Sequence, residues 1–409
     1  QPLLSVNFFL LRSRYYWKSR CLFLLVWFLF GCYSKPSKKN LVTESQLVVA
    51  PSKRSITLID TLSFNLDSLT SPKSWIFQFK VINDTPYYLL VNKAAFALQA
   101  YQFGKKYLFK RIVYEKQGPD KNVLNENFYF HTWDSIFFFS THPNKVSLFD
   151  STGKKKHVWN ISLKPEHEGY ILTTMEYYFR PYFNENRVGF WITPPVSPHK
   201  VEFYEKAKAV EYNLRTGNYV TYGDYPQNYL LNDISYMALC PINGYLTDQY
   251  NLLYYEASAN IYLYDRLSKN LVKIINAKSK YLPSKIPGLA TKNGENYPTV
   301  NEREKYYIST GFYEYMFTNE NYTYHFRIVK HQTDMKSVDG SWGRRDDYPF
   351  SIMIFDADFQ LIDEIQFPPG KYDYRQSFAY GDKMYISLNN PLNDEIDEDH
   401  LRFEVYLLK

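Results

Sequence analysis

Cysteine is scarce in this chain of 409 residues, which contains only Cys21, Cys32 and Cys240. So few cysteines exclude a small fold held together by a framework of disulfides. If the chain is cut before Cys32 and that residue is modified, Cys240 has no partner for a disulfide. We therefore expect no disulfide and predict that Cys240 is a small buried residue.

An apolar run long enough to span a membrane is also missing. The uncharged run CLFLLVWFLF (Cys21–Phe30) has ten residues, whereas a transmembrane helix needs about 20. Four basic residues precede it: Arg12, Arg14, Lys18 and Arg20. A basic segment followed by a short apolar core is typical of a secretory signal, which we predict to be residues 1–31 and to be cleaved.

The residues after the apolar run indicate how the chain is anchored. Leu29, Gly31 and Cys32 resemble the lipobox of bacterial lipoproteins, whose cysteine receives a lipid, and this resemblance makes Cys32 the expected lipidation site. Residues 32–54 then form a flexible tether. No acidic run follows Cys32, so we expect a protein of the cell envelope, anchored in the outer membrane and facing the periplasm. The alternative is a buried N-terminal helix with an incidental cysteine.

Motifs for catalysis and for cofactors are lacking. The chain contains no G-x-S-x-G, H-E-x-x-H or C-x-x-C motif, no phosphate-binding loop and no dinucleotide fingerprint. The net charge is +6, but the basic residues are scattered and form no stripe for nucleic acid. We therefore expect no cofactor, no bound metal and no nucleic-acid partner.

The chain is instead rich in aromatic residues and in short apolar runs. Aromatic residues make up 19% of it, with 40 Tyr and 30 Phe, and residues of these types suit the half-buried faces of sheets. From about Ser55 onward, short alternating runs are bounded by Asn, Asp, Gly and Pro, with hardly any helical period. The sequence therefore predicts an all-β domain over residues 55–409.

A local pattern recurs four times, in which a strand ends in an aromatic residue and Asp or Asn before a tight turn and a second strand. The aligned pairs are Phe149-Asp150, Tyr212-Asn213, Tyr264-Asp265 and Phe355-Asp356. Asp and Asn at a strand end can accept hydrogen bonds from the amides of the turn. A ring of metal-binding carboxylates is the alternative, which we disfavour because hairpin turns of repeated units lie far apart.

Two further strand-like runs before each hairpin give units of four strands. Counting them predicts a six-bladed β-propeller with blades at 75–118, 125–165, 170–226, 233–280, 303–369 and 374–409. The last unit is one strand short, and SITLIDTLSFNL (55–66) could complete it and remove an exposed sheet edge. Seven blades, or a pair of sandwiches, are the alternatives.

The lipobox, the repeated hairpins and the junction EKQGPD (Glu115–Asp120) together resemble a known group. They are similar to the six-bladed-propeller lipoproteins of Gram-negative anaerobes that are classed as a domain of unknown function, and distantly to NHL and TolB-like propellers. The resemblance covers nearly the whole mature chain. It implies a propeller fold and a lipid anchor, but it implies no catalytic residues.

Long loops between the second and third strands are the best remaining indication of a binding surface, because propeller function usually resides in the loops of one face. Such loops are predicted at 193–208, 331–349 and 390–400. The candidate ligand-binding residues are Trp342, Arg344, Arg345, Asp346, Asp347, Asp397 and His400. A stacking aromatic beside cations and carboxylates could hold a sugar or a peptide end, although the charges could also pair among themselves.

These features favour a non-catalytic binding or scaffolding protein whose ligand is a protein or a glycan. The alternative is a hydrolase or lyase that acts on a carbohydrate polymer. It would use Asp346 or Asp347 together with Asp397, since glycoside hydrolysis needs two carboxylates about 5 to 10 Å apart. The acidic residues of 394–399 could also bind Ca²⁺, but they lack the order of a calcium-binding loop.

Overall fold

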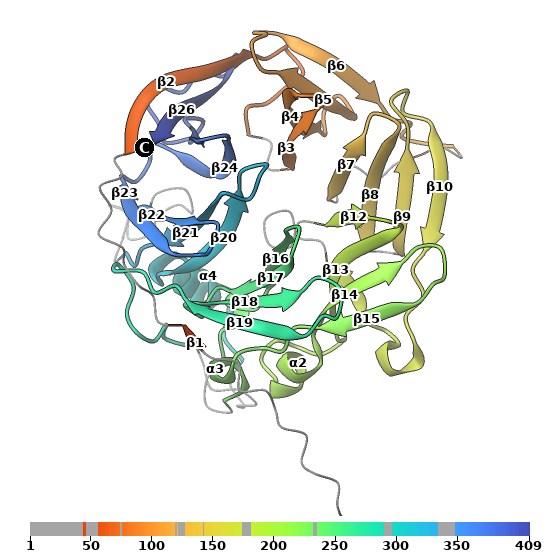
Figure 1. Ribbon diagram of the computed structural model, residues 1–409, viewed down its shortest axis with the longest axis vertical. Coiled ribbons are helices and arrows are strands. Elements are labelled where there is room, and N and C mark those ends of the chain that lie inside the picture. The colour runs from red at the N-terminus through yellow and green to blue at the C-terminus, as the bar shows by residue number, and fades with distance from the viewer. Residues whose placement is uncertain are drawn as a thin grey trace, which may run out of the picture. The chain divides into compact units, whose positions relative to one another are not determined.

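The computed structural model describes residues 44–45, 56–73, 76–118, 121, 127–141, 143–173, 181–231, 235–289, 297–333 and 348–409. All of them belong to one compact unit, Thr43–Lys409. Six sheets in this unit, each built on four antiparallel strands, are arranged around a central axis (Figure 1). The predicted six-bladed β-propeller is therefore confirmed, and the alternatives of seven blades or two sandwiches are wrong.

The first three blades follow the chain from the innermost strand outward. Blade 1 contains β3 (Phe77–Ile82), β4 (Thr85–Asn92), β5 (Ala97–Gln102) and β6 (Leu108–Val113). Blade 2 contains β7 (Phe128–Thr132), β8 (Ser135–Thr141), β9 (Asn144–Phe149) and β10 (Lys155–Asn160). Blade 3 contains β12 (Tyr182–Asn184), β13 (Arg187–Thr193), β14 (Lys208–Asn213) and β15 (Tyr219–Tyr222), and β11 (Ile171–Thr173) also pairs with β13.

The other three blades repeat this order. Blade 4 contains β16 (Ile242–Leu246), β17 (Tyr250–Tyr255), β18 (Asn260–Asp265) and β19 (Leu271–Asn276), with the short β1 (Glu44–Ser45) parallel to β19. Blade 5 contains β20 (Phe312–Thr318), β21 (Tyr324–Lys330), β22 (Phe350–Asp356) and β23 (Leu361–Phe367). Blade 6 contains β24 (Asp373–Tyr380), β25 (Lys383–Ser387), β26 (His400–Leu408) and β2 (Ile56–Asn65).

The ring is closed by the two ends of the domain. Strand β2 pairs antiparallel with β26, from Ile56 opposite Leu408 to Asn65 opposite His400. The predicted closing strand is thus confirmed. It occupies the outer position of blade 6 and gives that sheet its fourth strand.

The core lies between the blades, where one sheet faces the next. Phe79 of blade 1 stacks on Phe378 of blade 6 with ring centres 4.9 Å apart, and Phe137 of blade 2 stacks on Phe183 of blade 3 at 4.3 Å. Aromatic pairs of this kind stabilise by about 0.5 to 1.5 kcal/mol beyond their buried area. The high aromatic content therefore supplies the contacts that hold adjacent blades together.

The repeated Asp or Asn has the structural role expected of it. The Asp150 carboxylate accepts hydrogen bonds from the amides of Thr152 and Lys154 at 2.9 and 3.1 Å. Asn213, Asp265 and Asp356 each accept two amides of their own turns in the same way. Among the described residues, no group of three or more His, Cys, Asp or Glu could hold a metal ion.

In the described part of the chain, three α-helices stand where the sequence predicted loops or a strand. They are α2 (Val201–Lys206), α3 (Gln227–Leu230) and α4 (Val300–Ser309). Helix α4 begins with a capping box, in which the Thr299 hydroxyl accepts the Glu302 amide and the Glu302 carboxylate accepts the Thr299 amide. Blade 5 therefore begins at Phe312. The sequence prediction placed its start at residue 303 because the capping box of the helix was not recognised.

Cys240 is a free cysteine that is only partly buried, and its surroundings raise the pKa of the thiol to about 12 by desolvation.

The expected lipidation of Cys32 concerns a residue outside the described part of the chain. In that described part, none of the helices is long and apolar enough to cross a membrane.

Blades 1 and 2 touch at Gly153, and a substitution there would test how tightly the two blades pack. Gly153 has a φ of +83°, and a Cβ at this position would lie 2.0 Å from the Val113 carbonyl oxygen of blade 1. Gly104 has a similar φ of +78° but no atom within 4 Å of its Cβ position. Substitution of either glycine causes backbone strain, but only substitution of Gly153 also causes a clash between blades. Comparing the two changes therefore separates the two costs.

We predict that Gly153→Ala destabilises the domain by at least about 2 kcal/mol more than Gly104→Ala, because only the first change forces two blades apart. Gly104→Ala should cost about 1 to 2 kcal/mol, which is the strain of a left-handed alanine. Urea unfolding of the two variants measures the difference. Equal losses of stability would show that blades 1 and 2 are not tightly packed at Gly153.

Candidate functional site

A cavity of about 480 Å³ lies on the central axis and is lined by the innermost strands of all six blades. Nine of its 21 described lining residues are aromatic, and most of the others are polar or charged. The aromatic lining residues are Phe77, Phe79, Phe128, Tyr129, Tyr182, Tyr245, Tyr315, Phe317 and Tyr322. Small-molecule sites commonly have this size and consist of apolar walls with a few polar groups.

Lys80 is the notable charged group of this cavity. It lies on β3, and its ammonium group is 5.3 Å from the centre of the Tyr129 ring of blade 2. Burial lowers the pKa of Lys80. No carboxylate of the described residues forms an ion pair with it. A half-buried cation beside an aromatic face therefore has no anion to compensate it within the described protein.

The other charged groups in the lining have partners. The Arg375 Nε donates to Asp373 Oδ1 at 2.8 Å. Glu320 is the sole carboxylate among the described lining residues, and it accepts the Gly381 amide at 3.0 Å. Within the described lining, Lys80 is thus a cation without an ion pair, and Glu320 is a carboxylate that is held by a backbone amide.

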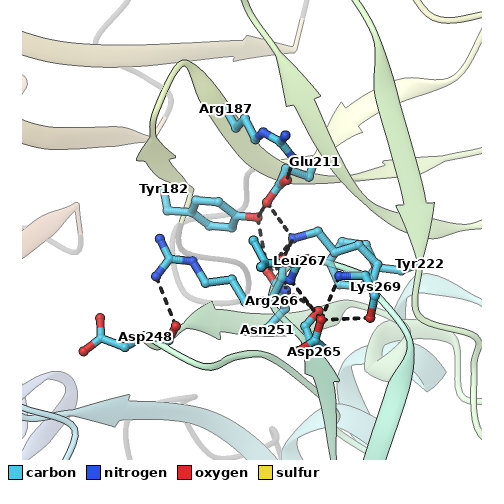
Figure 2. A network of polar contacts seen from close by, with 11 residues as sticks. Tyr182, Arg187, Glu211, Tyr222, Asp248, Asn251, Asp265, Arg266, Leu267 and Lys269 are labelled. Carbon is cyan, nitrogen blue, oxygen red and sulfur yellow. Dashed lines mark hydrogen bonds and ion pairs between the residues drawn. The ribbon is translucent and has the colours of Figure 1, made fainter.

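A polar network between blades 3 and 4 fixes Tyr182 in the cavity wall (Figure 2). The Tyr182 hydroxyl donates to Glu211 at 2.8 Å, and the same carboxylate accepts from Arg187 at 2.8 Å and from Lys269 at 2.7 Å. Although burial opposes ionisation, the hydrogen bonds from Lys269 and Arg187 outweigh it and lower the pKa of Glu211. The network therefore holds the ring of Tyr182 in place through a charged anchor.

The turn between β20 and β21 also lines the cavity and is tied to blade 6. Asn319 Oδ1 accepts the amides of Thr323 and Tyr324 at 2.9 and 3.1 Å, while its Nδ2 donates to the Gly381 carbonyl at 2.8 Å. Burial raises the pKa of Tyr322 in this turn. The turn is therefore a rigid part of the cavity.

The long connections lie where they were predicted. Residues 194–207, 331–349 and 388–399 each join the second and third strands of their blades, whereas the corresponding connections of blades 1, 2 and 4 have at most four residues. Because successive strands are antiparallel within each blade, the strand ends from which these connections start all lie at one end of the central channel.

Five of the predicted binding residues belong to a part of the blade 5 loop that is outside the described residues. They are Trp342, Arg344, Arg345, Asp346 and Asp347. The other two, Asp397 and His400, contact each other, with 2.7 Å between Oδ2 and Nδ1. Although desolvation opposes it, the Asp399 amide and His400 lower the pKa of Asp397. This pair is partly exposed and does not line the cavity.

The blade 3 loop contributes mainly to the core. Within it, Phe203 and Tyr204 of α2 are 4% and 0% exposed and pack with Tyr225 and Tyr229. On the predicted face, the blade 3 loop is therefore packed into the core. The blade 6 loop is held by hydrogen bonds between its own residues.

Sequence reasoning missed a set of buried ionisable groups on and next to the first two strands of blades 4 and 5. Glu256 is fully buried, and neither of its carboxylate oxygens has a hydrogen-bond partner among the described residues. Glu314 is 3% exposed and accepts the Tyr374 hydroxyl. Desolvation raises the pKa of both, that of Glu314 to about 7. A single glutamate within each apolar run, YYEA and FYEYMF, was the available signal.

Lys330 interacts electrostatically with Glu314 and compensates its charge only in part. It is fully buried, and its ammonium group donates to the carbonyls of Ile308 and Thr310 at 2.6 and 2.8 Å. Desolvation lowers its pKa to about 7, while the charge of Glu314 opposes this change. Burial thus favours the neutral forms of Lys330 and Glu314.

We predict that Glu314→Gln alters the dependence of stability on pH. Between pH 4.5 and about 7 the unfolded chain releases the Glu314 proton while the folded chain retains it, so the free energy of unfolding falls as pH rises. Relative to the wild type, the variant should gain about 3 kcal/mol between pH 4 and pH 8, at about 1.4 kcal/mol per pKa unit.

Urea unfolding across this pH range measures the effect, and Glu398→Gln serves as an exposed control. The control should follow the wild-type profile. If Glu314→Gln also follows it, Glu314 does not retain its proton in the folded protein.

Comparison with known proteins agrees with this architecture. A family model described as a domain of unknown function, DUF4221, matches residues 54–366. No curated protein matches the chain in sequence. The crystal structure of a DUF4221 family member from Bacteroides vulgatus is similar with a TM-score of 0.70 and 20% identity, over 87% of this chain and 98% of that one. A protein from Bacteroides fragilis, named as exported, has a TM-score of 0.50 and 10% identity, over 90% and 98% of the two chains. Because the family model spans most of the propeller, the chain belongs to the DUF4221 family.

Proposed function

We propose that this protein is an exported, non-catalytic binding protein of the cell envelope that recognises acidic glycans in its central cavity. The carrying observation is Lys80, which has no ion pair among the described residues, in a cavity to which all six blades contribute aromatic or polar side chains. The loops 193–208, 331–349 and 390–400 would contact longer ligands at one end of the channel. A protein ligand is the alternative that the experiment distinguishes.

The chemistry of the lining suits an acidic sugar. The face of a sugar ring carries C–H groups that pack on aromatic rings, and Tyr129, Tyr245 and Phe79 supply such rings. A uronic acid adds a carboxylate, which Lys80 would neutralise at a half-buried position where the attraction between charges is stronger than in water. The volume of about 480 Å³ is sufficient for one or two sugar units.

The arrangement of carboxylates supports binding over glycoside hydrolysis. Hydrolysis of a glycoside normally uses two carboxylates on either side of the scissile bond. Among the described lining residues only Glu320 is acidic, and it accepts a backbone amide. Asp397, the described member of the predicted catalytic pair, is held by His400 in its own loop.

The cellular location rests on the sequence and on one structural neighbour. The basic segment, the apolar core and Cys32 support export followed by lipid attachment, and the neighbour from Bacteroides fragilis is named as exported. Two or three acyl chains anchor a protein stably where one does not. We propose attachment through Cys32 to the outer membrane, with the propeller in the periplasm.

The ligand proposal predicts that digalacturonate binds more tightly than its carboxyl-reduced counterpart, and that Lys80→Met removes this preference. The acid should lose at least about tenfold in affinity, or 1.4 kcal/mol, while the neutral sugar is unaffected. Isothermal titration calorimetry of the chain beginning at Ser37, which contains every described strand, measures both affinities. Lys285→Met, at an exposed lysine, is the matched control.

A screen of glycans and peptides, carried out with the same chain, decides between the ligand classes. Binding of peptides alone would replace the glycan with a protein ligand, and a complete absence of binding would refute the proposed function. Trp342→Ala tests whether the blade 5 loop contributes. It should weaken longer glycans more than digalacturonate, because only they extend beyond the cavity.

The anchor proposal predicts that Cys32→Ser prevents lipidation. The wild-type chain, produced in a Gram-negative host, should incorporate labelled fatty acid and partition into the detergent phase, and the variant should do neither. Membrane fractionation then locates the labelled protein. An unlabelled wild-type chain would contradict the assignment of Cys32.

A further inference from the structure

Apolar side chains protrude from the outer strands of blades 1 and 2. Tyr107 is 68% exposed, Phe109 41% and Val113 56%, all on or next to β6, and Val158 on β10 is 39% exposed. We refer to these four residues, together with the lysines described next, as the basic rim. The outer strands run around the perimeter of the propeller, and β6 is followed there by β10 (Figure 1).

Lysines surround these side chains. The exposed lysines of the basic rim are Lys105, Lys106, Lys116, Lys154 and Lys156. The ammonium group of Lys105 lies 5.1 Å from the centre of the Phe109 ring, and that of Lys110 lies 4.9 Å from the ring of Trp133. Cations and aromatic rings are thus interleaved on one convex edge.

The positive charge is concentrated on this side of the molecule. Residues 76–164, which contain blades 1 and 2, carry 13 Lys and Arg against 6 Asp and Glu, a net charge of +7. Residues 165–409 carry 25 against 33, a net charge of −8. The modest charge of the whole chain therefore hides a strong separation of charge within the propeller.

The basic rim is continuous from one blade to the next. The Cβ position of Gly153, in the turn before β10, is 2.0 Å from the carbonyl oxygen of Val113 at the end of β6. This close contact joins the two outer strands end to end. The exposed residues of both strands therefore belong to one surface.

Protection of sheet edges does not explain this pattern. Lysines on an edge strand prevent unwanted pairing, but each propeller blade has such an edge. Strand β6 contains Lys110 and Arg111, and β10 contains Lys155 and Lys156. By contrast, β2, β15 and β23 contain no lysine or arginine, and β19 has Lys273 alone. A general need of edge strands would act on all six blades.

We propose that the basic rim docks the propeller edge-on against a membrane surface that contains anionic lipids. Aromatic side chains prefer the headgroup region of a bilayer, and each nearby lysine adds about 1 kcal/mol of attraction to anionic lipids. The basic rim is convex and its apolar side chains protrude singly, which suits a flat lipid surface. A lipid anchor at Cys32 would raise the effective concentration of the basic rim at that surface.

Vesicle co-sedimentation with the unacylated chain beginning at Ser37 tests the proposal. The probes are vesicles of phosphatidylcholine with and without phosphatidylglycerol. We expect binding only to the anionic vesicles and weakening by salt. The double change Tyr107→Ser with Phe109→Ser should reduce the affinity for the anionic vesicles at least about fivefold, the equivalent of losing about 1 kcal/mol.

The matched control is the equivalent part of blade 4. Leu267 and Val272 are 85% and 47% exposed in the corresponding turn and strand, so Leu267→Ser with Val272→Ser removes similar apolar area without touching the basic rim. This variant should bind like the wild type. Equal loss in both variants, binding to neutral vesicles alone, or no binding would overturn the proposal.

Self-association is the remaining outcome, because the acidic blades of a second copy could contact the basic rim. Analytical ultracentrifugation without lipid detects it. A dimer that is abolished by the Tyr107 and Phe109 changes, with no binding to vesicles, would replace the membrane with a second copy. A monomer that binds anionic vesicles supports the proposal.

Discussion

The pairing of β2 with β26 is the contact on which the rest of the structure depends. It gives blade 6 its outer strand and joins the beginning of the domain to its end. Without it, β26 would become an exposed edge and the ring would lose the link that fixes blade 6. Because the central cavity takes residues from every blade, its shape requires a closed ring.

Within the closed ring, residues outside the cavity hold several of its lining residues in place. Phe79 stacks on Phe378, Tyr182 donates to the Glu211 carboxylate, and the turn at Asn319 bonds to Gly381. Among the described residues no polar group anchors Lys80, and the ring of Tyr129 lies beside it. The walls are therefore fixed before a ligand arrives, which lowers the conformational entropy that binding would cost.

The sequence was sufficient to predict the fold because the information is local. Each hairpin carries its own aromatic residue and its own Asp or Asn, and the alternation of apolar residues marks the strands. The cavity could not be found this way, because it combines one or a few residues from each of six blades, from Phe77 to Arg375. Lys80 differs from other lysines only in what the fold places around it. Asp397 and His400 attracted attention through their local acidic cluster, yet the structure pairs them outside the cavity.

The closure of the ring also bears on how the protein folds. The partners Ile56 and Leu408 are 352 positions apart in the sequence, so the last blade cannot form until the final strand has been made. Contacts of such long range are slow to form, since a long loop must be closed before the contact is gained. An exported chain would cross the membrane with β2 first and would expose that strand, unpaired, until β26 follows. Protection of this single strand against pairing with other chains would therefore govern the yield of folded protein.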